Sequence, residues 1–108
     1  ALITEKGNLY VGCNVENASY GATICAERTA IVSAVAQEGP SMRIKTIVAL
    51  CQNKDGVMVD GCSCGVCRQV INEFALPETH IIYQLEGQLV SKPISQLLLD
   101  SFGRPNLK

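Results

Sequence analysis

Four residues in two short motifs have the types and the spacing of a catalytic metal site. Glu27 lies two positions after Cys25, and a C-x-x-C motif follows at Cys64 and Cys67. Three thiolates leave one position of a tetrahedral zinc ion open, which is typical of catalytic sites, whereas a structural zinc is closed by four protein ligands. A carboxylate beside that open position can accept a proton from water and pass it on. We therefore expect the three cysteines to bind zinc and Glu27 to carry protons.

The cysteines also allow other interpretations. A C-x-x-C motif alone is half of a zinc site, a redox dithiol or two ordinary cysteines. One alternative is a structural zinc module closed by Cys13 or Cys62, which has no use for Glu27. Another is a redox protein that uses Cys64 and Cys67 as a reducible dithiol without metal. The six cysteines of the chain could also form disulfides, but cysteine pairs in an intracellular enzyme are more often metal-binding or catalytic.

Two predicted helices begin at these motifs. Residues 25–38 predict a helix with Thr23 as its N-cap, ended by Gly39 and Pro40. Residues 65–75 predict a second helix, ended by Leu76 and Pro77, with apolar side chains recurring on one face. The positive end of a helix dipole lowers the pKa of a cysteine at the helix start and favours the thiolate that a metal needs.

The remaining segments predict a sheet around these helices. Residues 1–4 and 9–13 predict a hairpin around a turn-rich stretch. The other expected elements are strands over 43–52 and 80–85, a short strand or loop edge at 57–59, a turn at 86–87 and a short helix over 93–99. This order predicts an α/β fold, a mixed β-sheet flanked by helices on its faces, with residues 1–108 forming a single domain. The only histidine, His80, lies in a predicted strand far from both motifs and is expected to be an ordinary, partly exposed residue.

Composition excludes several classes of function. The chain has 108 residues, of which 47% are apolar and 18% charged, as in globular proteins. Nine Lys and Arg residues balance ten Asp and Glu residues, and no basic run is present, so a nucleic-acid partner is not expected. No apolar stretch reaches the roughly 18 residues of a membrane span, and no secretory leader is recognisable. We therefore expect a cytoplasmic protein without a membrane partner.

Three segments resemble the small homotetrameric, zinc-dependent cytidine deaminases of pyrimidine salvage. These segments are NVENASYG (residues 14–21), ICAERTAI (24–31) and CGVCRQVINEF (64–74), in the same order and spacing. The resemblance spans nearly the whole chain and ends with Leu97-Leu98-Leu99 and Ser101-Phe102-Gly103. It implies hydrolysis of cytidine and deoxycytidine to uridine and deoxyuridine with release of ammonia. In this reaction, zinc-bound hydroxide attacks C4.

The resemblance assigns roles around the metal. It implies that Cys25, Cys64 and Cys67 bind one Zn²⁺ ion per chain and that Glu27 shuttles protons. Three thiolates make the site anionic, which weakens the effect of zinc on the pKa of bound water. Two helix N-termini and the side chain of Arg28 can withdraw charge from the sulfurs, and the family uses the equivalent arginine to hydrogen-bond its metal-binding cysteines.

The resemblance also assigns substrate contacts. Asn14 and Glu16 are expected to hydrogen-bond the ribose hydroxyls, and the backbone of Ala26 to contact the pyrimidine carbonyl. Residues two positions apart in extended backbone point the same way, so Asn14 and Glu16 can meet one edge of a ribose. Tyr20 and Phe102 are expected to reach substrate in neighbouring subunits of a homotetramer.

The sequence departs from the family pattern at two places. The family has a proline before the C-x-x-C motif, where this chain has Ser63 preceded by Cys62. Serine does not fix φ and is expected to loosen the ligand loop, while Cys62 could compete as a ligand or oxidise. The family also carries an N-terminal helix and a phenylalanine-containing segment before the strand that starts at Ala1, so we expect the chain to be a fragment. A blasticidin-type deaminase is the main rival within the fold, and the NVENASY segment favours ordinary nucleosides.

Overall fold

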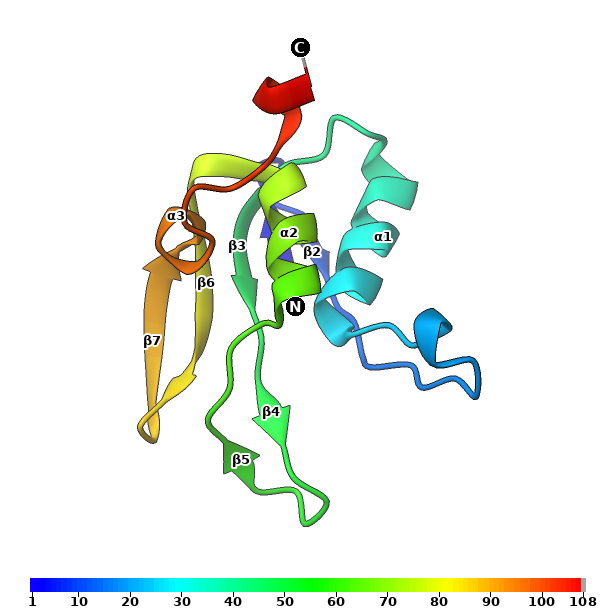
Figure 1. Ribbon diagram of the computed structural model, residues 1–108, viewed down its shortest axis with the longest axis vertical. Coiled ribbons are helices and arrows are strands. Elements are labelled where there is room, and N and C mark those ends of the chain that lie inside the picture. Colours follow the sequence, from blue (N-terminus) through cyan, green and yellow to red (C-terminus); the bar gives the residue numbers. More distant parts are fainter. Residues whose placement is uncertain (108) are drawn as a thin grey trace.

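Five strands form one mixed sheet in the order β2-β1-β3-β6-β7 in the computed structural model, which describes residues 1–107 (Figure 1). They are β1 (Leu2–Thr4), β2 (Leu9–Tyr10), β3 (Ile44–Val48), β6 (Ala75–Leu85) and β7 (Gln88–Pro93). β3 and β6 run parallel, and the other neighbouring pairs are antiparallel. Parallel strands need a long crossover connection. Here the connection contains the helix α2 (Gly65–Glu73) and a separate ribbon of β4 (Cys51–Gln52) and β5 (Met58–Val59).

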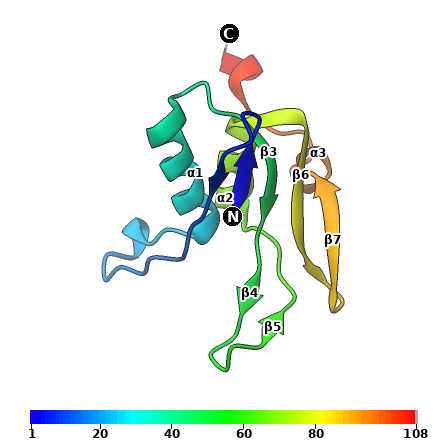
Figure 2. The same ribbon diagram turned by 180° about the vertical axis from the view of Figure 1, so that it is seen from behind.

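The two longer helices, α1 (Ala26–Glu38) and α2 (Gly65–Glu73), cover the same face of the sheet. They lie side by side in front of the strands in Figure 1 and behind them in Figure 2. The short helix α3 (Ile94–Leu97) contacts both β6 and α2. Two 3₁₀ turns complete the described chain, η1 (Tyr20–Ala22) and η2 (Arg104–Leu107). The predicted α/β class, a mixed sheet with helices, is confirmed. Within residues 1–107 the helices are too short or too polar to cross a membrane.

The core lies between these helices and the sheet. Its fully buried side chains come from alternate positions of the strands and from the facing sides of both helices, and they include Leu2, Ile31, Ile44, Ile47, Ile71 and Ile81. Burying an aliphatic side chain of this size contributes about 1.5–3 kcal/mol. Ala30 and Ala34 of α1 are also fully buried, and their small size lets this helix lie close to its neighbours. The core therefore holds the N-terminal ends of α1 and α2 next to one another.

The predicted N-cap of the first helix is wrong. Cys25 is the N-cap of α1, with extended backbone, and Thr23 instead follows the η1 turn. The hydroxyl of Thr23 accepts a hydrogen bond from the backbone N–H of Asn17 at 3.1 Å, so it stabilises the preceding loop. The predicted end of this helix is confirmed, because the backbone turns at Gly39 with a φ of 86°.

Three strand predictions also need correction. The strand predicted over 43–52 is divided between β3 and β4, and β4 pairs only with β5. β6 begins at Ala75, five residues before the predicted start, and runs through Pro77. β7 was not predicted. It pairs with β6 across a turn in which Glu86 and Gly87 both have positive φ, a conformation that matches the twist of a hairpin.

Candidate active site

The three cysteines of the two motifs lie together at the N-terminal ends of α1 and α2. Their Sγ atoms all lie within 4.8 Å of one another. Cys25 and Cys64 are the N-cap residues of the two helices, and Cys67 is fully buried in the first turn of α2. The first N–H groups of a helix have no intrahelical partner and carry the positive end of its dipole. Both helices therefore favour negative charge where the sulfurs meet.

This cluster fits a tetrahedral zinc ion with one open position. A Zn–S distance of about 2.3 Å places tetrahedral thiolates roughly 3.8 Å apart, within the observed limit of 4.8 Å. In the part of the chain that the structure describes, no fourth Cys, His, Asp or Glu joins the group, and neither Cys13 nor Cys62 belongs to it. Three protein ligands are the number found in catalytic rather than structural zinc sites.

The surroundings of the thiols give them different pKa values. Burial raises the pKa of the Cys67 thiol to about 12, and a hydrogen bond from Arg28 acts in the opposite direction. The backbone N–H of Cys67, at the start of α2, lowers the pKa of the Cys64 thiol. The expected lowering of a thiol pKa at a helix start is thus observed at Cys64, whereas burial is the largest influence on the pKa of Cys67. Because Cys67 must lose its proton to bind a metal, zinc affinity falls as pH falls.

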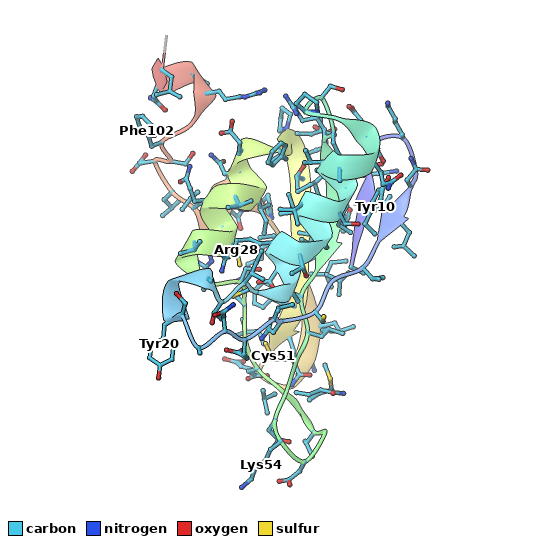
Figure 3. The ribbon with its side chains drawn as sticks, turned by 90° about the vertical axis from the view of Figure 1, so that its right-hand side faces the viewer. Tyr10, Tyr20, Arg28, Cys51, Lys54 and Phe102 are labelled. Carbon is cyan, nitrogen blue, oxygen red and sulfur yellow. The ribbon has the colours of Figure 1, made fainter. Side chains whose placement is uncertain are left out.

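The guanidinium of Arg28, which is labelled in Figure 3, contacts two of the three cysteines. Its Nη2 atom lies 3.7 Å from Cys25 Sγ, and the group also hydrogen-bonds Cys67. These two bonds raise the pKa of Arg28 above its ordinary value. A permanent cation at this point offsets the charge that three thiolates bring to a site with a dication.

Glu27 lies in the first turn of α1 and borders a cavity of about 420 Å³ that Cys25 and Cys64 also line. This volume lies in the range of small-molecule sites, roughly 300–1,000 Å³. The Glu27 carboxylate makes no hydrogen bond to any group of residues 1–107, so it is available to a ligand. A larger cavity of about 620 Å³ lies near the C-terminal end of α2. It contains no cysteine, so the chemistry of the lining residues favours the smaller one.

The opposite wall of this cavity was missed by sequence reasoning. Ala49 and Leu50 follow β3, and Cys51 and Gln52 form β4. The signal is the end of the parallel strand β3, because ligands bind at the carboxyl ends of such strands. The prediction of one continuous strand over 43–52 concealed this end.

Asn14 caps helix α1 from a distant position in the sequence. Its Oδ1 atom accepts a hydrogen bond of 2.8 Å from the backbone N–H of Ala26. Asn14 also lines the cavity, and its Nδ2 group makes no hydrogen bond within residues 1–107. A pyrimidine carbonyl that contacts Ala26 would have to share or replace the Asn14 oxygen. Sequence reasoning missed this interaction because the two residues are twelve positions apart.

The segment that carries Asn14 is pressed against the first turns of α1. A Cβ atom at Gly12 would lie 2.6 Å from the backbone nitrogen of Ala30, so only glycine fits there. The Thr29 hydroxyl lies 2.9 Å from the carbonyl oxygens of both Cys13 and Ala26. Gly12 and Thr29 are therefore positioning residues that the sequence did not reveal.

Glu16 lies two residues after Asn14 in the same segment. Val15 forms an antiparallel bridge with Ile24, with hydrogen bonds of 2.9 and 3.0 Å. Residues on either side of an extended residue point the same way, so this bridge is compatible with the prediction that Asn14 and Glu16 meet one edge of a ribose. Glu16 itself is exposed and does not line the 420 Å³ cavity.

Tyr20 and Phe102 do not line this cavity either. Tyr20 is 90% exposed in the η1 turn, and Phe102 is 60% exposed after α3. Figure 3 shows both rings extending away from the body of the molecule. His80, on β6, is likewise outside the cysteine cluster.

Comparison with known proteins agrees with this geometry. Residues 1–83 match the family model described as the cytidine and deoxycytidylate deaminase zinc-binding region. The cytidine deaminase of Sporosarcina psychrophila is 36% identical, over 99% of this chain and 75% of its own length. A blasticidin-S deaminase of Bacillus cereus is 29% identical, over 91% of this chain and 71% of its own length. The crystal structure of cytidine deaminase from Burkholderia pseudomallei superposes with a TM-score of 0.75 at 35% identity, covering 94% of this chain and 78% of that one.

Proposed function

The chain belongs to the family of zinc-dependent cytidine and deoxycytidylate deaminases, and from this premise we propose that it acts on free nucleosides in cytoplasmic pyrimidine salvage. Its substrates are cytidine and deoxycytidine, which it hydrolyses to uridine and deoxyuridine with release of ammonia. One observation carries the proposal. Cys25 and Cys64 of the three-cysteine cluster line the same cavity of about 420 Å³ as Glu27, whose carboxylate makes no hydrogen bond within residues 1–107.

Each residue of the cluster has a part in this reaction. Cys25, Cys64 and Cys67 hold one zinc ion per chain, which when bound acts as a Lewis acid and makes hydroxide available near pH 7. Glu27 accepts a proton from the attacking water and delivers it to ring N3 as C4 becomes tetrahedral. Glu27 then takes the proton of the new C4 hydroxyl and delivers it to the amino group, which leaves as ammonia while C4 becomes the carbonyl of the product. Arg28 stabilises the thiolates throughout.

The sugar and the base are read by the segment that caps α1. The Asn14 Nδ2 group donates to a ribose oxygen, and the Glu16 carboxylate accepts from a ribose hydroxyl. The N–H of Ala26 donates to the pyrimidine carbonyl when the substrate replaces the Asn14 oxygen at that position. Support for this assignment comes from the extended backbone around Val15 and from the position of Asn14 on the cavity wall.

The working form is a homotetramer in which Tyr20 and Phe102 complete the sites of neighbouring subunits. Two exposed aromatic rings outside the cavity of their own chain support this arrangement. Sedimentation of an active sample should give the mass of four chains. An active sample that contains only monomer would contradict the proposal.

The deciding experiment measures turnover and zinc on the same sample. We expect cytidine and deoxycytidine to lose their characteristic absorbance with release of ammonia, at one zinc per chain. X-ray absorption should show three sulfurs and one light atom around the metal. A zinc-loaded sample that deaminates blasticidin S but neither nucleoside would contradict the proposal and show that the chain is a blasticidin-type deaminase. Four sulfurs on the zinc would make the site structural.

A further inference from the structure

Side chains on one side of α2 contact the end of α3 and the segment that follows it, and two of these contacts are hydrogen bonds to backbone carbonyls. Arg68 Nη1 donates to the carbonyl of Leu97 at 2.9 Å, and Gln69 Nε2 donates to the carbonyl of Phe102 at 2.8 Å. At the far end of the segment, Arg104 Nε lies 3.0 Å from Glu73 Oε1. Residues 68, 69 and 73 lie on adjacent rows of the helix surface, so α2 contacts this segment along its length.

The same helix carries the metal ligand Cys67 and fixes the turn that carries Cys64. Arg68 Nε donates to the carbonyl of Ser63 at 2.7 Å, directly before Cys64. Ser63 is 97% buried, since only 3% of its surface is exposed, so this turn is held from inside the molecule. α2 therefore joins two parts of the chain in one rigid element: the metal-binding turn and the segment that carries Phe102.

The Gln69 side chain hydrogen-bonds the backbone carbonyl of Phe102 directly, whereas other side chains hold its neighbours, Asn72 at Ser101 and Asn106 at Gly103. Residues 101–103 lie outside the helices and strands, so no regular backbone pairing fixes Phe102. The ring is 60% exposed, and burial does little to orient it. The Gln69 amide is itself exposed, yet it reaches the Phe102 carbonyl across 33 positions of sequence. Within residues 1–107, this is the one hydrogen bond that the Gln69 side chain makes.

We propose that Gln69 is a positioning residue that sets the place of Phe102. In this arrangement, α2 supplies Cys67 to the site of its own chain and, through Gln69, presents an aromatic ring to the site of a neighbouring subunit. The inference rests on the proposed function, in which Phe102 contacts substrate in the neighbouring subunit. It adds Gln69 as the residue through which α2 contributes to the site of a neighbouring subunit as well as to the site of its own chain.

A double-mutant cycle tests this role. Phe102→Ala should raise the KM for cytidine by roughly 2- to 10-fold, the scale of one aromatic contact, with little change in kcat. Gln69→Leu, which cannot donate, should raise KM by a similar or smaller factor while zinc content stays at one per chain. In the Phe102→Ala background, Gln69→Leu should have no further effect on KM, because residues that act as one unit are non-additive.

Two variants control for chemistry and for folding. Gln69→Glu keeps the size of the side chain but removes the donor, so it should match Gln69→Leu. Gln37→Leu removes an exposed amide from α1 that makes no hydrogen bond within residues 1–107, and it should leave KM unchanged. If Phe102→Ala raises KM and Gln69→Leu does not, or if the two effects add fully, this inference fails alone. If Phe102→Ala leaves KM unchanged, the neighbour-site role in the proposed function fails with it.

Mixed assemblies test whether Gln69 acts on the neighbouring site. A chain with Glu27→Gln and Gln69→Leu has no working site of its own, so any turnover comes from wild-type partners. Mixed with wild-type chains, it should raise the measured KM relative to a matched mixture that contains Glu27→Gln alone. The inference would be overturned if the two mixtures had equal KM values although Gln69→Leu raises KM when every chain carries it. Gln69 would then act only on the site of its own chain.

Discussion

Two glutamates occupy the two ends of α1 and differ in every contact. Glu27, in the first turn, makes no hydrogen bond with residues 1–107 and borders the cavity of the cysteine cluster. Glu38, in the last turn, accepts three hydrogen bonds through Oε2, from Thr4 at 2.8 Å, Asn8 at 2.9 Å and Tyr10 at 3.1 Å. The first carboxylate faces a ligand site, and the second faces its own chain.

The helix dipole shows why these environments differ. A carboxylate is favoured at a helix N-terminus and disfavoured at a C-terminus, so Glu27 needs no partner and Glu38 does. The donors that satisfy Glu38 all belong to the β1–β2 hairpin and the turn within it, and the carboxylate therefore fastens this hairpin to α1. A carboxylate whose Oε2 atom accepts three hydrogen bonds from its own chain has a structural role, although its Oε1 atom is buried without a partner. A carboxylate that borders a cavity and has no hydrogen bond within residues 1–107 is available to a ligand.

The largest expected effect is the loss of turnover on changing Glu27, in the first turn of α1. Glu27→Gln should retain one zinc per chain and a normal melting temperature, because the side chain contacts neither the core nor the metal. The kcat for cytidine should fall by at least about 10²–10⁴-fold, the usual contribution of a general acid–base group. Steady-state kinetics beside zinc quantification measures both. Half of the wild-type activity in a zinc-loaded variant would remove Glu27 from the mechanism.

A smaller effect is expected one loop away, at Glu16. Glu16→Ala should lower kcat/KM for cytidine at least about tenfold, the scale of a lost charged hydrogen bond of about 1.5–3 kcal/mol. It should affect 2′,3′-dideoxycytidine far less, since that analogue lacks both ring hydroxyls of the ribose, and free cytosine should be a poor substrate for the wild type. Equal losses on cytidine and dideoxycytidine would make Glu16 a structural residue.

The catalytic end of α1 was accessible from sequence because its geometry is local. Cys25 and Glu27 share one helix start, and Cys64 and Cys67 share another, so their spacing fixes how each pair lies. The resemblance implied that the two pairs meet. Their meeting depends on the crossover between the parallel strands β3 and β6, which the fold shows.

Other features depend on contacts between distant segments. The capping of Ala26 by Asn14, the close approach of Gly12 to α1 and the donors around Glu38 leave no pattern in the local sequence. β7 was missed because its alternation is weak and its last residue is a proline, which reads as a break. Sequence reasoning therefore identified the three cysteines that lie together and missed the contacts that position them, while the role of Glu27 as proton carrier stays a prediction.

The smallest expected effect tests the structural end of α1 through pH. The hydrogen bond from Asn8 is the largest cause that lowers the pKa of Glu38 below its ordinary value. A carboxyl group with a depressed pKa stabilises the fold above its unfolded-state pKa, and this contribution is lost as pH falls through the folded-state pKa.

Glu38→Gln keeps one oxygen that can accept hydrogen bonds but removes the charge. Urea unfolding of both zinc-loaded proteins across the acid range should therefore show that the stability gap between them narrows as pH falls. Activity on cytidine near neutral pH should be unchanged. Glu5→Gln, in the turn of the same hairpin, is the matched control, since the Glu5 side chain is exposed and makes no hydrogen bond within residues 1–107. A gap that is the same at every pH would mean that the charge of Glu38 does not hold the hairpin, and that neutral hydrogen bonds alone fasten it to α1.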